Sequence, residues 1–242
     1  MSVTSRSAPV RKKPPFSVSQ KSRTRTSWRA IAYYAAHRSD GAPGLALAHV
    51  AAFRWTLMAL TVTGIVLVSA GSVTYPGSPY DLFARTIRAP RGIERVTRHP
   101  FFVGVALFAL AHALLATRLV GTVGFGSLAL LAIAGARHQD AKLLARSGQP
   151  YADYLAATSA VPFAAVLAGR QRFVWRELAL GTLAAGLGIA AALRAVHESI
   201  FAHGGAWVIG TVIGAAAIFS WQSWRRARRV GRTSPRLAPS AR

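Results

Sequence analysis

The sequence predicts an all-α protein, a bundle of about six helices that crosses a membrane several times. Hydrophobic residues make up 52% of the 242-residue chain and charged residues only 15%, whereas a soluble domain carries about a quarter charged residues. The hydrophobic residues also gather in runs close to the ~20 residues that a helix needs to cross a bilayer. The five long runs are residues 45–71, 101–116, 119–136, 178–196 and 205–221.

Each helix has its own signal along the chain. A short first helix is predicted at residues 28–37, before the run 45–71. Pro100 precedes the next run and suits a first helical turn, where its missing N–H would have no partner. The turn at Thr117 and Arg118 makes that run and the next an antiparallel hairpin. Gly121, Gly124 and Gly126 then resemble positions where helix backbones approach closely. The apolar segment 161–167 is too short to span and is predicted to be interfacial or re-entrant.

The net charge of +23 raises the question of nucleic-acid binding, and the distribution of the charges argues against it. Lys and Arg fall between the apolar runs and at the termini, with no face or repeat that would follow a phosphate backbone. In the six-helix arrangement, 26 of the 30 basic residues lie on one side, as the positive-inside rule expects. We therefore predict a multi-pass protein of the inner cell membrane with both termini in the cytoplasm and lipid as its neighbour.

The two ends of the chain are predicted to be tails. Residues 1–26 and 225–242 mix Ser, Thr, Pro and basic residues without apolar periodicity, a composition typical of disorder. Residues 27–224 form the predicted transmembrane domain. With no cysteine in the chain, thiolate ligands, nucleophilic thiols and disulfides are excluded. Motifs such as G-x-S-x-G, H-E-x-x-H and the P-loop are also absent.

The predicted hairpin sorts the polar residues into two clusters. His112 lies 12 positions after Pro100, the first residue of the predicted helix, and therefore ~18 Å along the helix axis, so His99 and His112 cannot share one metal. The hairpin returns the second helix to the cytoplasmic face. The predicted cytoplasmic cluster is Arg98, His99, Arg137, His138 and Asp140, with Tyr151 and Tyr154 just downstream. The predicted outer cluster is His37, His49, His112, His197 and His203.

The outer cluster favours one kind of metal chemistry. Imidazoles without cysteine and with little carboxylate suit haem iron or copper better than calcium or magnesium, and two axial imidazoles can hold a haem between helices. The alternative is that these histidines hydrogen-bond to backbone carbonyls or lie at the lipid headgroups. His112, inside an apolar helix, fits that alternative least well, because an ionisable side chain in a lipid-spanning segment is costly.

Residues 92–172 resemble a known family. The sequence GIERVTRHP at 92–100 is similar to that family's GI-x-R-x-TRHP motif. It is followed by LAHAL at 110–114, a turn around Asp140, Ser147-Gly148, TSAVPFAA at 158–165 and Gly169-Arg170-Gln171. This order of motifs resembles the NnrU family, which includes 15-cis-zeta-carotene isomerases and bacterial proteins associated with nitric oxide and nitrite metabolism (denitrification).

The resemblance implies a cofactor and its ligands. The family's carotene isomerases are haem b proteins with histidine ligands, and their Ala-His-x-Leu histidine corresponds to His112. The other family ligand corresponds to His37, where Gly41 stands in place of the expected alanine. The resemblance implies a redox-dependent cis–trans isomerase acting on a hydrophobic carotenoid, or a protein that handles nitric oxide at the same iron.

Two further classes of function remain open from the residues. Membrane methyltransferases of the isoprenylcysteine and phospholipid types also carry Arg-His-Pro before a hydrophobic hairpin. In that case Arg98, His99 and Tyr154 would hold S-adenosylmethionine, although Asp140-Ala141 stands where those enzymes have a Glu pair. The other alternative is a non-enzymatic membrane protein whose cytoplasmic cluster only joins the hairpins.

Overall fold

The computed structural model describes residues 39–81 and 86–197, together with single residues of the segments 29–37 and 214–228. Within this part the chain is helical, and its one β feature is an isolated bridge between Pro43 and Arg118. The long helices are α2 (Ala51–Thr74), α4 (Pro100–Leu115), α5 (Leu119–Ser147) and α8 (Leu180–Ala195). The short ones are η1 (Leu47–His49), α3 (Ile93–Val96), α6 (Gln149–Ala157), α7 (Ala164–Leu167) and η2 (Trp175–Glu177). The predicted all-α class is confirmed for these residues.

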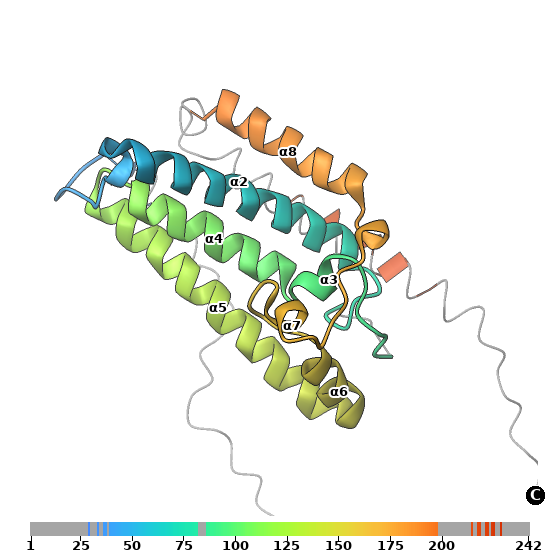
Figure 1. Cartoon of the computed structure of the whole chain (residues 1–242). Coiled ribbons are helices and arrows are strands. Elements are labelled where there is room, and N and C mark those ends of the chain that lie inside the picture. The colour runs from blue at the N-terminus through green and yellow to red at the C-terminus, as the bar shows by residue number, and fades with distance from the viewer. Residues whose placement is uncertain are drawn as a thin grey trace, which may run out of the picture.

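The four long helices lie side by side in the order α8, α2, α4, α5 (Figure 1). The short helices α3, α6 and α7 gather at one end of this layer, where α2 ends and α4 begins (Figure 1). We call this end the Asp140 end, after the residue near the close of α5. The opposite end, which contains the α4–α5 turn, is called the His112 end. The two clusters predicted from the sequence therefore belong to opposite ends of the bundle.

Helices α2 and α4 cross at a pair of glycines. A Cβ on Gly64 would lie 2.7 Å from the carbonyl oxygen of Gly104, and a Cβ on Gly104 would lie 2.6 Å from that of Gly64. Further along, a Cβ on Gly71 would lie 2.6 Å from the backbone nitrogen of Phe101. The missing side chains let the two backbones meet directly, as small residues do between helices in membranes. This contact fixes where the end of α2 lies against the start of α4.

Helix α5 extends beyond the apolar run that predicted it. The run ends at residue 136, but the helix continues to Ser147 and stops at Gly148, whose φ of 57° favours glycine. The extra residues include Gln, Lys and Arg, which are good helix formers, so the helix outlasts its hydrophobic stretch. As a result Asp140 lies on a helix rather than in a turn. The segment predicted to be interfacial, 161–167, contains the short helix α7.

Two helices, α2 and α5, are long and apolar enough to cross a membrane, judged by length and composition. Helices α4 and α8 are also apolar but have 16 residues each, a length of about 24 Å against a hydrocarbon core of ~30 Å. The predicted helices at 28–37 and 205–221 and both predicted tails lie outside the continuously described residues. The six-helix topology therefore stays a prediction.

Candidate functional site

The carboxylate of Asp140 is the centre of a polar network at the Asp140 end. Arg98 donates from Nε and Nη2 to Oδ2 of Asp140, at 3.0 and 2.9 Å. The other oxygen, Oδ1, accepts from Nε2 of His99 at 2.9 Å and from the hydroxyl of Tyr151 at 2.6 Å. Charge-assisted hydrogen bonds of this kind are the strong ones. They tie α5 to the start of α4 and to α6.

The tyrosine hydroxyls extend the network in a defined direction. The hydroxyls of Tyr151 and Tyr80 lie 3.0 Å apart. Because Tyr151 has one hydroxyl hydrogen and gives it to the Asp140 carboxylate, Tyr80 must donate to the oxygen of Tyr151. Burial raises the pKa of Tyr80, and burial together with the Asp140 carboxylate raises that of Tyr151. Both phenols are therefore neutral at physiological pH, and hydrogen-bond donation runs from Tyr80 through Tyr151 to Asp140.

Local backbone geometry holds the Arg98–His99 pair in place. The backbone N–H of Arg98 donates to the carbonyl oxygen of Ser159 at 2.9 Å, and the hydroxyl of Thr97 donates to the carbonyl oxygen of Ala160 at 2.8 Å. Thr97 is fully buried and His99 is 3% exposed. The segment after α6 thus packs onto the residues before α4, which explains why motifs 60 residues apart in the sequence act as one structural unit.

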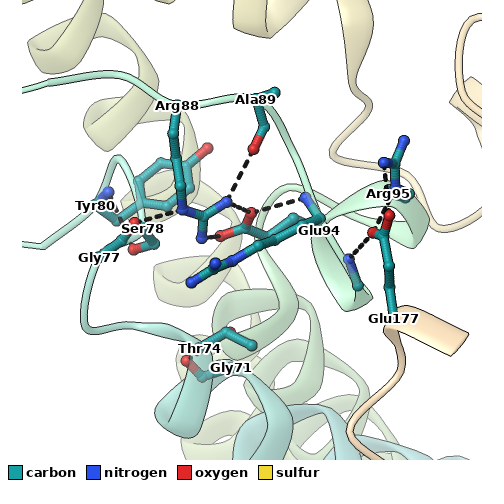
Figure 2. Close-up of polar contacts among 12 residues, drawn as sticks. Gly71, Thr74, Gly77, Ser78, Tyr80, Arg88, Ala89, Glu94, Arg95 and Glu177 are labelled. Carbon is teal, nitrogen blue, oxygen red and sulfur yellow. Dashed lines mark hydrogen bonds and ion pairs between the residues drawn. The ribbon is translucent and has the colours of Figure 1, made fainter.

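A second set of ion pairs lies beside this network (Figure 2). Arg88 donates to both oxygens of Glu94 at 2.6 and 2.9 Å, and Glu94 is 1% exposed. Arg95 donates to both oxygens of Glu177 at 2.8 and 2.9 Å. The Arg95 guanidinium and the N–H of Gly92 lower the pKa of Glu177 to about 2. A buried carboxylate costs free energy unless it is paired, so Arg88 is what allows Glu94 to sit inside.

Three of the five residues of the predicted cytoplasmic cluster meet in the structure, and the other two do not join them. Arg98, His99 and Asp140 meet, as the hairpin geometry predicted. Arg137 and His138 are exposed on α5 and make no hydrogen bond or ion pair with any described residue. His138, two positions before Asp140, points to another face of α5. Arg137, three positions before, lies on the same side of the helix as Asp140 but is exposed to solvent.

Three participants were not predicted from the sequence. In the sequence, Tyr151 lies only downstream of the predicted cluster, and Tyr80 and Glu94 belong to neither predicted cluster. A usable signal existed for Glu94, because the chain has only seven acidic residues and this one lies within a basic segment. No local signal marks Tyr80, which reaches the network through the fold of the loop after α2.

Two cavities flank the network. One, of about 310 Å³, lies between the end of α2 and the start of α4 and is lined by residues including Tyr80, Arg98, His99 and Phe102. The other, of about 470 Å³, lies between α2, α3 and the start of α8, and Arg91 and Glu177 are at its polar side. Both are at the Asp140 end of the bundle.

At the His112 end, the structure places His112 among aromatic rings. Its Nδ1 lies 2.9 Å from the carbonyl oxygen of Phe108. A carbonyl only accepts, so Nδ1 carries the hydrogen and Nε2 keeps its lone pair. The rings of Phe108 and Phe125 lie 4.1 and 5.0 Å from the imidazole, centroid to centroid. The imidazole of His197, just after α8, lies 6.4 Å away.

The other predicted outer histidines differ in their surroundings. His37 donates from Nδ1 to the carbonyl oxygen of Tyr33 at 3.0 Å and stacks on the Tyr33 ring. Its Nε2 therefore keeps a lone pair, to which no described residue donates. His49 is exposed at the end of η1, and His203 lies outside the described residues. Among the residues described, no group of three or more His, Cys, Asp or Glu could hold a metal ion.

The residues at this end fit a haem in their donor chemistry. A ligating histidine usually donates its second ring nitrogen to a carbonyl or carboxylate, as His112 does to Phe108. The imidazole of His197 lies 6.4 Å from that of His112, centroid to centroid, and would be available as a second ligand, whereas the sequence predicts His37 as the partner.

Comparison with known proteins places this chain in a family. The NnrU protein family model matches residues 26–221, most of the chain. The chain belongs to the NnrU family. The resemblance seen in residues 92–172 is thereby confirmed and extended to both sides of that segment.

Two curated relatives of this NnrU protein have an activity in their names. It is 29% identical over 152 residues to the chloroplastic 15-cis-zeta-carotene isomerase of Zea mays, and 31% identical over 153 residues to that of Arabidopsis thaliana. These matches cover 59% and 58% of this chain but only 39% and 38% of the relatives. The matched part is thus less than half of either plant protein. No solved structure matches this chain.

Proposed function

We propose that this protein catalyses the cis–trans isomerisation of a double bond in a carotenoid. The observation that carries the proposal is the match to two plant 15-cis-zeta-carotene isomerases over 152 and 153 residues. A carotenoid is a hydrocarbon that dissolves in the bilayer, and the apolar helices α2 and α5 are suited to meet it there. The Asp140 end shows that Arg98 and His99 are already bonded to Asp140, which does not favour the methyltransferase alternative.

We propose that the protein is located in a membrane. The chain crosses this membrane several times, and both termini lie in the cytoplasm. Support comes from the length and composition of α2 and α5 and from the 26 of 30 basic residues that this topology gathers on one side. In this orientation the Asp140 end faces the cytoplasm and the His112 end faces outward.

The proposed cofactor is a haem b held by His112. His112 would bind through Nε2 while its Nδ1–H donates to Phe108, which fixes the orientation of the ring. For a second ligand, the sequence resemblance points to His37, and the nearness of a second imidazole in the structure supports His197. A reduced haem supplies an electron-rich metal that can lower the order of a polyene double bond. The chain's own residues would hold and orient it, with Phe108 and Phe125 packed against the His112 ring.

To test the activity, membranes that contain this protein are incubated with 15-cis-zeta-carotene and a reductant under anaerobic conditions. The carotene isomers are then separated by chromatography. We expect conversion to the trans isomer at C15 by the intact chain and at least a tenfold lower rate for His112→Ala. His49→Ala changes an exposed histidine at the same end and should leave the rate unchanged. Equal rates for the intact chain and His112→Ala would reject the role of His112.

The cofactor is tested separately by absorption spectra of protein purified after expression with added haem precursor. His112→Ala should lose the Soret band, whereas His99→Ala, about 20 Å away along α4, should keep it. Comparing His37→Ala with His197→Ala identifies the second ligand as the one whose loss changes the spectrum to a five-coordinate form. If the unmodified protein prepared in this way shows no Soret band, the proposed haem binding is rejected. A haem that binds nitric oxide in a protein without isomerase activity would favour the nitric oxide role.

A further inference from the structure

The cavity of about 310 Å³ at the Asp140 end combines aromatic walls with buried polar atoms. Tyr80 and Phe102 pack around His99, at ring centroid distances of 4.8 and 5.9 Å, and all three line the cavity. Phe101 also lines it and is 45% exposed on the outer surface of α4. The cavity therefore reaches the apolar exterior of the bundle, so a ligand that enters here can come from the lipid phase.

The charges around this cavity cancel one another. Arg98 lines it, but Nε and Nη2 of its guanidinium are bonded to Asp140. Glu94 lines it too, and both of its oxygens are bonded to Arg88. An anionic or cationic ligand would have to break one of these pairs, and each break leaves a buried charge unpaired. The cavity is thus built for a neutral molecule.

The directions of the hydrogen bonds decide what that molecule must offer. Nε2 of His99 donates to the Asp140 carboxylate, and the imidazole tautomer that this hydrogen bond selects has its lone pair on Nδ1. No described residue donates to that Nδ1. Tyr80 spends its hydroxyl hydrogen on Tyr151, which leaves its oxygen as an acceptor. The cavity thus presents two acceptors, on His99 and Tyr80, and the ligand must be a hydrogen-bond donor.

We propose that this cavity binds the hydroxyl-bearing aromatic head group of a neutral, lipid-soluble molecule of the quinol class, which donates hydrogen bonds to Nδ1 of His99 and to the hydroxyl oxygen of Tyr80. The aromatic walls accept a flat ring, and the apolar tail of the molecule extends past Phe101 into lipid. This site is at the opposite end of α4 from His112 and is independent of the proposed isomerisation.

The test uses the full-length protein in detergent and three probes that share one decyl-substituted ring. They are the benzoquinol, the corresponding benzoquinone, and the quinol dimethyl ether, titrated anaerobically by calorimetry. The quinol donates two hydrogen bonds, and neither other probe donates any. We expect the quinol to bind at least about tenfold more tightly than both, since one hydrogen bond to a buried group is worth roughly this factor. Equal affinity for the quinol and its dimethyl ether would overturn the proposal.

Two variants locate the binding site. In His99→Gln the amide still donates to Asp140 but the Nδ1 acceptor is lost, and Tyr80→Phe removes one hydroxyl while keeping the ring. We expect each to weaken quinol binding at least about fivefold and to leave dimethyl ether binding unchanged. His138→Gln is the matched control, because His138 is exposed on α5, and it should bind the quinol as the unmodified chain does. Should His99→Gln fail to fold, Tyr80→Phe alone decides, and unchanged quinol affinity in that variant would overturn the proposal.

Discussion

At the scale of single residues, Asp140 joins three separate parts of the chain. It accepts hydrogen bonds from Arg98, His99 and Tyr151, so one carboxylate connects the start of α4, the extension of α5 and α6. Its side chain is 15% exposed, and the cost of removing a charge from water is large unless the charge is paired. We therefore expect the members of the network to be energetically coupled. Removing one of them leaves the other buried polar groups without a partner and lowers the free energy of unfolding.

Replacing Arg98 and Asp140 by alanine, singly and together, measures this coupling. Arg98→Ala leaves the Asp140 carboxylate without its charge partner, while the double variant removes both charges. We expect a coupling free energy of about 1–3 kcal/mol from chemical denaturation in detergent followed by circular dichroism. The control pair is Arg137→Ala with Asp140→Ala, since Arg137 is exposed, and its coupling should stay within about 0.5 kcal/mol. Additive effects of Arg98→Ala and Asp140→Ala would show that their contact contributes nothing to stability.

At the scale of the elements, the position of α4 against α2 depends on two glycines. The sequence pointed to Gly121, Gly124 and Gly126 on α5 as close-packing positions. In the structure a close crossing lies at Gly64 and Gly104, whereas a Cβ on Gly126 would meet no atom within 4 Å, and Gly121 is buried on α5. The prediction therefore fails for Gly126, because packing depends on which face of each helix meets its neighbour.

Gly104→Ala tests the crossing. Its Cβ would lie 2.6 Å from the carbonyl oxygen of Gly64, so the two backbones must separate and packing is lost along α2 and α4. We expect a destabilisation of about 1–3 kcal/mol, measured as a lower midpoint of thermal unfolding in detergent. Gly126→Ala is the matched control in open space, and it should be neutral or stabilising by up to about 1 kcal/mol. If both variants unfold at the same temperature, the α2–α4 crossing is not the close contact described.

At the scale of the whole molecule, the two ends of the bundle differ in chemistry. At the Asp140 end, three arginine side chains form ion pairs with Glu94, Asp140 and Glu177. The His112 end carries imidazoles and aromatic rings. In the predicted orientation, the Asp140 end would face the cytoplasm together with the basic segments. The proposed quinol site and the proposed haem site would then open on opposite sides of the membrane.

Reporter fusions check this orientation. A reporter fused near Ser78, in the loop at the Asp140 end, or after Arg242 should report the cytoplasm. A reporter fused near Gly204 should report the outer side. The measurement compares alkaline phosphatase activity with green fluorescent protein fluorescence for each fusion. An outer location for the Ser78 fusion would contradict the topology and the assignment of the two ends.

The sequence by itself determined where the long helices lie and which family the chain belongs to. Apolar runs form helices because local hydrophobicity and length suffice. Helices α4 and α8 therefore begin and end close to the predicted runs, whereas α2 covers 51–74 instead of the predicted 45–71. The meeting of Arg98 and His99 with Asp140 also followed from the sequence, because a tight turn forces two consecutive helices to be antiparallel.

Only the tertiary structure decided which side chains meet at each end. Helices that are apolar on all sides carry no amphipathic pattern to show which face turns toward a neighbour. The nearness of His197 to His112, the arrival of Tyr80 at Tyr151 and the burial of Glu94 against Arg88 all depend on that rotation. Each joins residues from separate segments, and such contacts are set by backbone packing, above all by the glycine crossing of α2 and α4, rather than by any local sequence pattern.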